Sequence, residues 1–238
     1  MARRVSLRDA ALTRVCLAFA WLTRVLPLPA ARALTIGLGR IAYWLVPRVR
    51  RVGLANLEAA YGDTKTPAQK RRILRGAVDN VARVGAEFSR IPQLAARGFQ
   101  GIGYVRGLEH LPKDSGVLLV AGHLGNWEWM APLLAAQGVR VAEVVRPLND
   151  PALDHFVEST REAGGIATIP KYHAGNELLQ RLRDGWIVGI LIDQSPRESA
   201  VPVHFFGRPC WATAGPVVIA RRAKVPVHMA RMIREASG

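Results

Sequence analysis

The second half of the chain alternates short apolar runs with stretches of helical periodicity. The run at 117–121 has the length of a buried strand, and Gly122, Gly125 and Asn126 then interrupt it. Apolar residues recur at helical spacing over 127–137, and Asn126 is a good residue for a helix N-cap. The pattern therefore predicts a strand, a tight turn and a helix.

The same alternation continues to the end of the chain, and it is typical of an α/β fold. We expect a mixed central sheet flanked by helices. The expected strands are 117–121, 139–145, 166–169, 186–192 and 225–230, and the expected helices are 127–137, 151–163, 174–184 and 213–223.

The N-terminal part is apolar but interrupted. Four arginines and two prolines divide residues 10–46, so no apolar run is long enough to span a bilayer. A signal peptide is disfavoured because no convincing A-x-A cleavage site follows the apolar region before the next arginine. An amphipathic helical hairpin lying at a membrane interface fits better. We expect residues 1–50 to form this interfacial segment and residues 51–238 to form the α/β domain.

A long helix is predicted at about 68–90, after a basic hinge at 47–51 and a helical pattern at 52–61, and Thr66 is its expected cap. Its predicted apolar stripe consists of Ile73, Leu74, Ala77, Val81, Val84 and Phe88.

The formal net charge of +15 is concentrated in the N-terminal half. Residues 1–106 carry +14, whereas residues 107–238 carry +1. Such an asymmetry indicates an anionic polymer or an anionic membrane surface as partner. A non-enzymatic protein that binds nucleic acid or anionic membranes is therefore an alternative. Because the basic half is also strongly apolar and lacks a nucleic-acid motif, we expect a membrane and no nucleic acid.

His123 and Glu128 form an H-x4-E spacing at the junction of strand and helix. On one continuous helix they would lie about 140° apart, but a turn between them can bring the side chains together. The carboxylate of Glu128 can then hold one imidazole nitrogen while the other accepts a proton. The alternative is a solvated histidine beside a glutamate that stabilises the helix dipole.

Several other classes of enzyme and binding protein are disfavoured because their characteristic motifs are missing. The motifs G-x-S-x-G, P-loop, G-x-G-x-x-G and H-E-x-x-H are absent from the sequence. Cys16 and Cys210 match no metal or redox spacing, and we expect them to be small buried residues. We predict neither a metal nor a bound cofactor.

The wording around His123, V-A-G-H-L-G-N-W-E-W, resembles the active-site block of the lysophospholipid acyltransferase superfamily. It is most similar to the branch of lipid A biosynthesis acyltransferases and phosphatidylinositol mannoside acyltransferases. The resemblance continues, in the family's order, through residues 144–154, 191–194, 203–209 and 213–220.

The resemblance implies a glycerolipid acyltransferase-like fold and an enzyme that moves a fatty acyl chain from a thioester to a lipid hydroxyl. The donor would be acyl carrier protein or acyl-CoA, and the acceptor a glycolipid or lysolipid such as a lipid A precursor. The hydroxyl would attack directly, with His123 as general base oriented by Glu128 and without an acyl-enzyme. The protein would lie at the cytoplasmic face of the inner membrane, peripheral or N-terminally anchored. Family members usually continue for several more elements, so we expect a truncated C-terminal end.

The resemblance also marks Arg161 and Asp193. Arg161 would hold a phosphate or the oxyanion, and Asp193 would fix that arginine or position the acceptor; a purely structural pair is the alternative. Arg146, Asn149 and Gln194 are weaker candidates for substrate contacts. A hydrolase using His123 and Asp193 would lack a nucleophile. Aromatic residues are candidates for an acyl channel or for plain core, namely Trp127, Trp129, Phe205, Phe206 and Trp211.

Overall fold

The N-terminal part of the protein is helical. The computed structural model describes residues 7–171, 175–194 and 200–235. Pro27 separates the first two helices, as the predicted hairpin requires, and the expected hinge at 47–51 is the first turn of the third helix. The helices are α1 (Leu7–Val25), α2 (Leu28–Leu45), α3 (Pro47–Tyr61), α4 (Pro67–Phe88) and α5 (Ile91–Ala95). None of the described helices is both long and apolar enough to cross a membrane.

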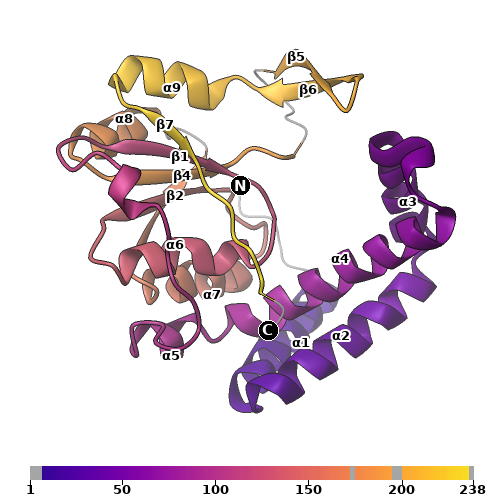
Figure 1. Cartoon of the computed structure of the whole chain (residues 1–238). Coiled ribbons are helices and arrows are strands. Elements are labelled where there is room, and N and C mark those ends of the chain that lie inside the picture. The colour runs from indigo at the N-terminus through magenta and orange to yellow at the C-terminus, as the bar shows by residue number, and fades with distance from the viewer. Residues whose placement is uncertain (1–6, 172–174, 195–199, 236–238) are drawn as a thin grey trace.

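Helix α4 packs against the other three long helices of this helical part. Thr66 caps it in a capping box with Gln69, as the sequence predicts. Helix α2 lies alongside α4, and α3 packs against the N-terminal part of α4 (Figure 1). The predicted apolar stripe is wrong at Ala77 and Val81, which are exposed, because α2 and α3 cover other positions of α4.

The C-terminal part contains a five-stranded sheet in the order β3-β2-β4-β1-β7. Each described pairing in this sheet is parallel, whereas the sequence predicts a mixed sheet. Parallel pairing follows from the helical crossovers that join successive strands. The strands are β1 (Val117–Ala121), β2 (Val141–Val145), β3 (Ile166–Pro170), β4 (Ile187–Leu191) and β7 (Val227–Met229).

Helices cover both faces of the sheet, which confirms the α/β fold. Figure 1 shows α8 (Gly175–Arg183) and α9 (Gly215–Ala223) on one face and α6 (Trp127–Ala135) and α7 (Pro151–Glu162) on the other. Strand β1 serves both cores because its side chains alternate between the faces. Leu118 packs in the core under α8 and α9, whereas Val117 and Leu119 pack in the core under α6.

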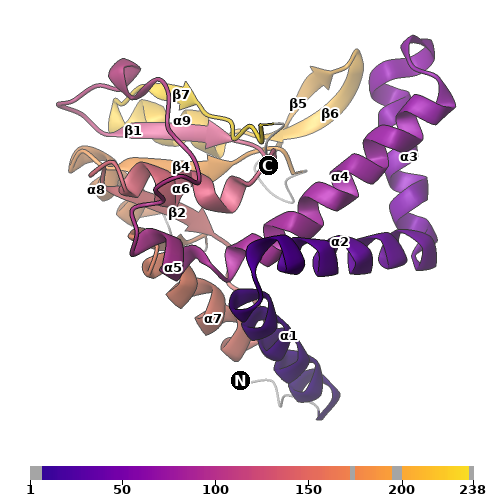
Figure 2. The ribbon, with the colours of Figure 1, turned by 60° about the horizontal axis from the view of Figure 1, so that its bottom comes forward.

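Helix α1 connects the helical part to the α/β part. Figure 2 shows α1 beside α7. The Thr13 hydroxyl donates a hydrogen bond of 2.6 Å to the Asp150 carboxylate at the start of α7. Asp150 also caps α7 by accepting from the backbone N–H groups of Ala152 and Leu153.

An antiparallel hairpin of β5 (Ala200–Phe205) and β6 (Arg208–Thr213) stands apart from the main sheet. The sequence predicts neither strand. Phe206 and Gly207 turn the chain with positive φ angles of 50° and 71°, as a tight hairpin turn requires. The expectation that Cys16 and Cys210 are buried is wrong, since Cys16 lies on an exposed face of α1 and Cys210 on this exposed hairpin.

Candidate functional site

The register of β1 and β4 decides which residues meet at the carboxyl edge of the sheet. These neighbouring parallel strands pair residue by residue from Val117 with Ile187 to Ala121 with Leu191. Two residues beyond the last pair, His123 and Asp193 therefore face each other. Carboxyl edges of parallel strands are where α/β proteins bind ligands.

Asp193 holds His123 at two points. Its Oδ1 lies 2.7 Å from the imidazole Nδ1, and its Oδ2 accepts from the His123 backbone N–H at 2.7 Å. Burial opposes the charge of the Asp193 carboxylate, but these hydrogen bonds prevail and hold its pKa below the ordinary value. Gly122 makes the approach possible, because a Cβ there would lie 3.1 Å from Oδ2.

The imidazole remains accessible on its other side. The His123 side chain is 31% exposed, and its Nε2 has no hydrogen-bond partner among the described residues. The Trp127 ring packs edge-on against the imidazole, with 5.0 Å between ring centroids. A fixed Nδ1 and an open Nε2 are the arrangement of a histidine that exchanges protons with a ligand.

Glu128 has a different partner from the expected one. Instead of the His123 imidazole, it binds Arg161, whose Nη2 lies 3.0 Å from both carboxylate oxygens and whose Nε lies 3.2 Å from Oε2. Helix α6 begins at Trp127, so Glu128 lies in its first turn and points toward α7. The expectation that Glu128 orients His123 directly is corrected in this respect, and so is the expected pairing of Arg161 with Asp193.

Glu128 nevertheless reaches the histidine through Trp127. The indole Nε1 of Trp127 donates to Glu128 Oε1 at 3.1 Å, and the same indole contacts the imidazole. Arg161 also lies over the Phe88 ring, 5.8 Å from its centroid. Glu128 and Arg161 are 15% and 18% exposed, so the pair is largely shielded from water.

A second carboxylate, Glu143 on β2, belongs to this cluster and was not singled out from the sequence. One of its oxygens lies 3.8 Å from Arg161 Nε. Burial raises the pKa of Glu143 to about 7, the Arg161 charge lowers it, and the Glu128 charge raises it. The only sequence signal was an acidic residue inside the apolar run 139–145.

Helix α4 fixes the turn that carries His123. Asn126 caps α6, as predicted, and its Nδ2 donates to Glu87 at 2.7 Å. Asn80, which lies two turns before Glu87 on α4, donates to the carbonyl of Gly125 at 2.8 Å. Gly125 has a φ of 61°, and a Cβ there would collide with the carbonyl of Met232, so the position requires glycine.

Glu87 is fully buried and is the centre of a charged network. Its carboxylate binds Arg32 of α2 at 2.7 Å and Arg234 of the C-terminal segment at 2.7 Å. Together with Asn126, these partners join four separate segments of the chain at one carboxylate. Glu87 was not singled out from the sequence, although an acidic residue next to the apolar stripe positions Val84 and Phe88 was a usable signal.

The weaker candidates lie apart from this network. Arg146, Asn149 and Gln194 are exposed and make no side-chain hydrogen bond with any described residue. Trp129 is core, since its ring packs on Phe99. The aromatic residues of the hairpin are exposed, and no group of described His, Cys, Asp and Glu side chains has the arrangement of a metal site.

Comparison with known sequences gives a family match over nearly the whole chain. The model of the family described as bacterial lipid A biosynthesis acyltransferase matches residues 2–238. The chain belongs to this family. The family therefore includes both the helical part and the α/β part, and the predicted resemblance is confirmed.

Two curated relatives of this acyltransferase family member come from Mycobacterium tuberculosis, strains CDC 1551 / Oshkosh and ATCC 25618 / H37Rv. Each is named a phosphatidylinositol mannoside acyltransferase and is 25% identical over 171 residues. The match covers 66% of this chain and 54% of each relative. The chain thus spans about half the length of the curated relatives that it matches.

Proposed function

We propose that the protein transfers a fatty acyl group from a thioester donor to a hydroxyl of a glycolipid or lysolipid, with His123 as general base. The observation that carries this proposal is the pair of hydrogen bonds from His123 to Asp193, which leaves Nε2 open. Membership of the lipid A biosynthesis acyltransferase family supports the reaction class.

The proposed reaction is one direct displacement. The acceptor hydroxyl oxygen attacks the thioester carbonyl carbon while His123 Nε2 takes the hydroxyl proton. The carbonyl oxygen becomes an oxyanion, and its collapse breaks the carbon–sulfur bond. The imidazolium then gives its proton to the leaving thiolate, so that an ester and a free thiol result. Asp193 fixes the tautomer with the proton on Nδ1 and stabilises the imidazolium.

We assign Glu128 a positioning role rather than direct contact with the base. It ties Arg161 to Trp127, and Trp127 packs against the imidazole. Arg161 Nη1 makes no hydrogen bond with the described residues, so Arg161 is our candidate for stabilising the oxyanion or a substrate phosphate. Arg146, Asn149 and Gln194 remain candidates for acceptor contacts at the same edge of the sheet.

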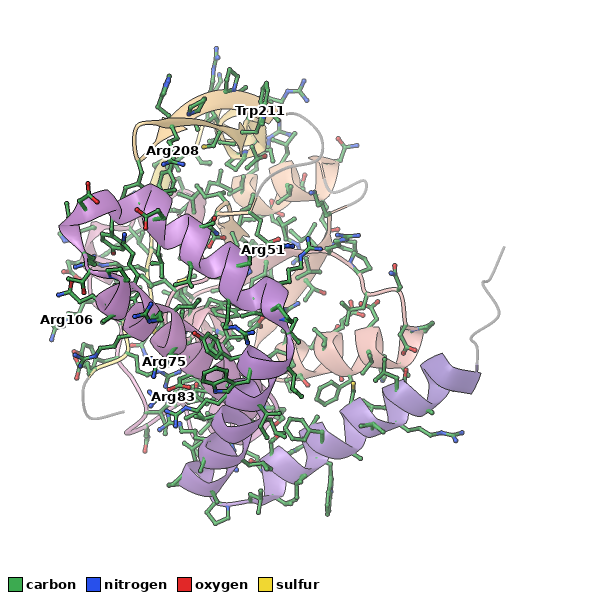
Figure 3. All side chains as sticks on the ribbon, turned by 90° about the vertical axis from the view of Figure 1, so that its right-hand side faces the viewer. Arg51, Arg75, Arg83, Arg106, Arg208 and Trp211 are labelled. Atoms are coloured by element: carbon green, nitrogen blue, oxygen red, sulfur yellow. The ribbon has the colours of Figure 1, made fainter. Side chains whose placement is uncertain are left out.

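We propose acyl carrier protein as the donor partner, with acyl-CoA as the alternative. Figure 3 shows arginines from several elements on one side of the molecule, with Trp211 of the hairpin among them. These are Arg51 of α3, Arg75 and Arg83 of α4, Arg106 and Arg208. A surface of this kind is complementary to an acidic carrier protein.

We further propose that the helical part rests on an anionic membrane. Large apolar side chains that would otherwise face water gather on α1 and α2, including Trp21 at 64% and Trp44 at 69% exposure. Arginines between them would lie at the level of the lipid phosphates. The inner membrane is the surface that we propose.

The decisive experiment compares the lipids produced by the wild-type chain and His123→Ala. Membranes would be incubated with each protein and with acyl carrier protein charged with mixed chain lengths, and new acylated lipids identified by mass spectrometry. We expect new species with the wild type and none with the folded variant, as checked by circular dichroism. Equal product from the two proteins would reject His123 as the base.

A further inference from the structure

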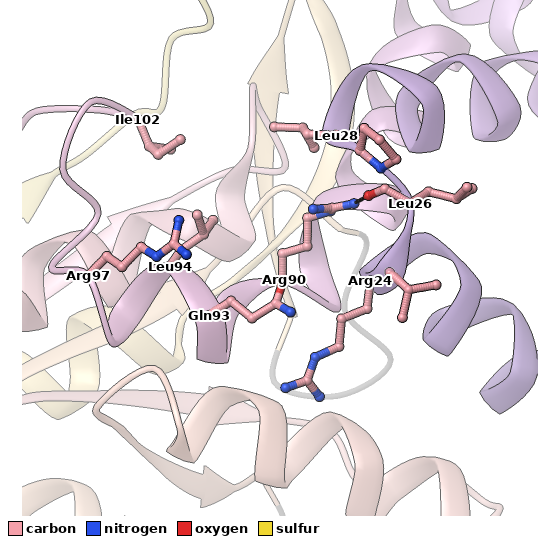
Figure 4. A pocket seen from close by; sticks show the side chains of 10 residues that line it. Arg24, Leu26, Leu28, Arg90, Gln93, Leu94, Arg97 and Ile102 are labelled. Atoms are coloured by element: carbon pink, nitrogen blue, oxygen red, sulfur yellow. Dashed lines mark hydrogen bonds between the residues drawn. The ribbon is translucent and has the colours of Figure 1, made fainter.

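A cavity of about 490 Å³ lies where the turn between α1 and α2 meets the end of α4 and the segment around α5. Arg24, Arg90 and Arg97 line it together with Gln93 and apolar side chains (Figure 4). No carboxylate is among the described residues that line it. The cavity shares no lining residue with the cluster around His123.

Arg90 lines this cavity, is partly buried and has no counter-ion among the described residues. Its Nη2 donates to the carbonyl of Thr23 at 2.7 Å and to that of Leu26, so two carbonyl dipoles are its described partners. Its Nε is buried and lacks a hydrogen-bond partner among the described residues. Burial and the nearby Arg32 charge lower its pKa, as expected for a cation that no anion compensates.

Arg24 and Arg97 add two more uncompensated charges at the opening. Both side chains are exposed, and neither makes an ion pair with any residue in the described ranges. Figure 4 shows Arg90 between Arg97 on one side and Arg24 on the other, with its guanidinium hydrogen-bonded to Leu26. Three guanidinium groups around one cavity make a site for an anion with several acceptor oxygens, such as a phosphate.

Apolar side chains also line the cavity beside the arginines, which a free phosphate would not need. Leu26, Leu28 and Leu94 line the interior. Val25 is 54% exposed and Ile102 is 37% exposed, and both lie on the cavity lining. Trp21, 64% exposed on α1, lies one helical turn before Val25. Cations beside exposed apolar side chains match an amphiphile whose charged head is a phosphate.

We propose that this cavity binds the headgroup phosphate of an anionic phospholipid, with the glycerol and upper acyl carbons against Val25 and Ile102. The lipid is a bound ligand and not a reactant, so the proposal goes beyond acyl transfer. Binding would fix the turn between α1 and α2 to the membrane. Because Arg90 lies three residues after Glu87, the lipid would also be held close to the network that supports the His123 turn.

Calorimetric titration of the full chain with short-chain phosphatidylglycerol, below its micelle concentration, tests the proposal. We expect Arg24→Gln combined with Arg97→Gln to weaken binding at least about tenfold, since each lost charged hydrogen bond is costly. Both side chains are exposed, so the variant should fold. The matched control, Arg71→Gln combined with Arg72→Gln on exposed positions of α4, removes the same charge and should bind as the wild type does.

Three outcomes would overturn the proposal. Equal weakening in the two double variants would mean a general charge effect. Inorganic phosphate binding as tightly as the lipid would assign the cavity to a free anion. Loss of binding in His123→Ala would place the lipid at the catalytic histidine instead, whereas retained binding there keeps this test independent of the proposed acyl transfer.

Discussion

The carboxylate of Asp193 binds both the backbone N–H and the imidazole Nδ1 of His123, each at 2.7 Å. A single side chain thus fixes the position of the residue and the orientation of its ring. Both groups follow neighbouring parallel strands, so the contact depends on the sheet and not on the short loop around His123.

Asp193→Asn should lower kcat by about a hundredfold or more while leaving the fold intact. The amide keeps the shape of the side chain but loses the charge that stabilises the imidazolium. Steady-state kinetics with a saturating donor would measure the loss. Asp114→Asn, at an exposed position before β1, is the matched control. A similar loss in both variants would mean that removing a surface charge, and not the contact with His123, matters.

Glu128→Gln should destabilise the protein by about 3 kcal/mol, because the largely buried Arg161 charge loses its counter-ion. Adding Arg161→Gln should recover part of this loss. Urea unfolding of the wild type, both single variants and the double variant gives the four free energies of this double-mutant cycle. Additive effects would contradict a direct pair.

Arg161→Lys separates a catalytic from a structural role for this arginine. An ammonium cannot reproduce the planar fork, so a role in stabilising the oxyanion predicts a loss mainly in kcat. A lower melting temperature with unchanged kcat would leave Arg161 with a structural role only.

Glu143 should make stability fall as pH rises from about 4.5 to about 7. Its pKa in the folded protein is about 7, above the unfolded value, so the folded state binds more protons in this window. Above pH 7, the loss of this proton lowers the free energy of unfolding by about 3 kcal/mol in total. Glu143→Gln should flatten this part of the curve of unfolding free energy against pH. An unchanged slope would show that other groups cause it.

Glu87→Gln should destabilise the protein strongly, because Arg32 and Arg234 would face one uncharged amide in a buried site. Asp79→Asn on the same helix is the control, since its partner Arg40 is 62% exposed and the pair contributes little. Thermal melts of the two variants should therefore differ clearly. Near-identical melting temperatures would contradict a structural role for the buried network.

Arg51→Glu combined with Arg208→Glu should raise KM for acyl carrier protein and leave kcat nearly unchanged, because these residues would contact the carrier and not the acyl group. Arg221→Glu combined with Arg222→Glu, on exposed positions of α9, makes the same charge change elsewhere. Equal effects of the two pairs would reject a specific docking face.

The local elements were predictable because local patterns encode them. The five expected strands of the main sheet and the caps at Thr66 and Asn126 are present. The resemblance marked Asp193 as a site residue, but its hydrogen bonds to His123 were not predictable. They depend on β4 lying next to β1, and spacing along the chain does not encode strand order. Glu128 lies only five residues from His123, and this proximity favoured a contact that the direction of α6 does not allow.

The hairpin and the buried carboxylates were missed for a different reason. Phe205 and Trp211 belong to an aromatic run that is typical of core, but they lie exposed on two short strands. Glu87 and Glu143 are acidic residues inside otherwise apolar patterns. A carboxylate is tolerated in such a position when charged or polar side chains surround it. Those partners come from other segments of the chain, so the local pattern does not reveal them.

The parallel register also determines where the chain tolerates a change in length. His123 and Asp193 lie seventy residues apart, the same separation as every paired position of β1 and β4. An extra residue in the turn at Gly138 or Gly165, outside both strands, leaves each strand end aligned with the other. One residue inserted or removed between Ala121 and His123 instead turns the imidazole to the opposite side of the sheet. The contact between His123 and Asp193 is thus insensitive to the length of nearly every segment between them, and it is sensitive only to the two short segments that join each residue to its strand.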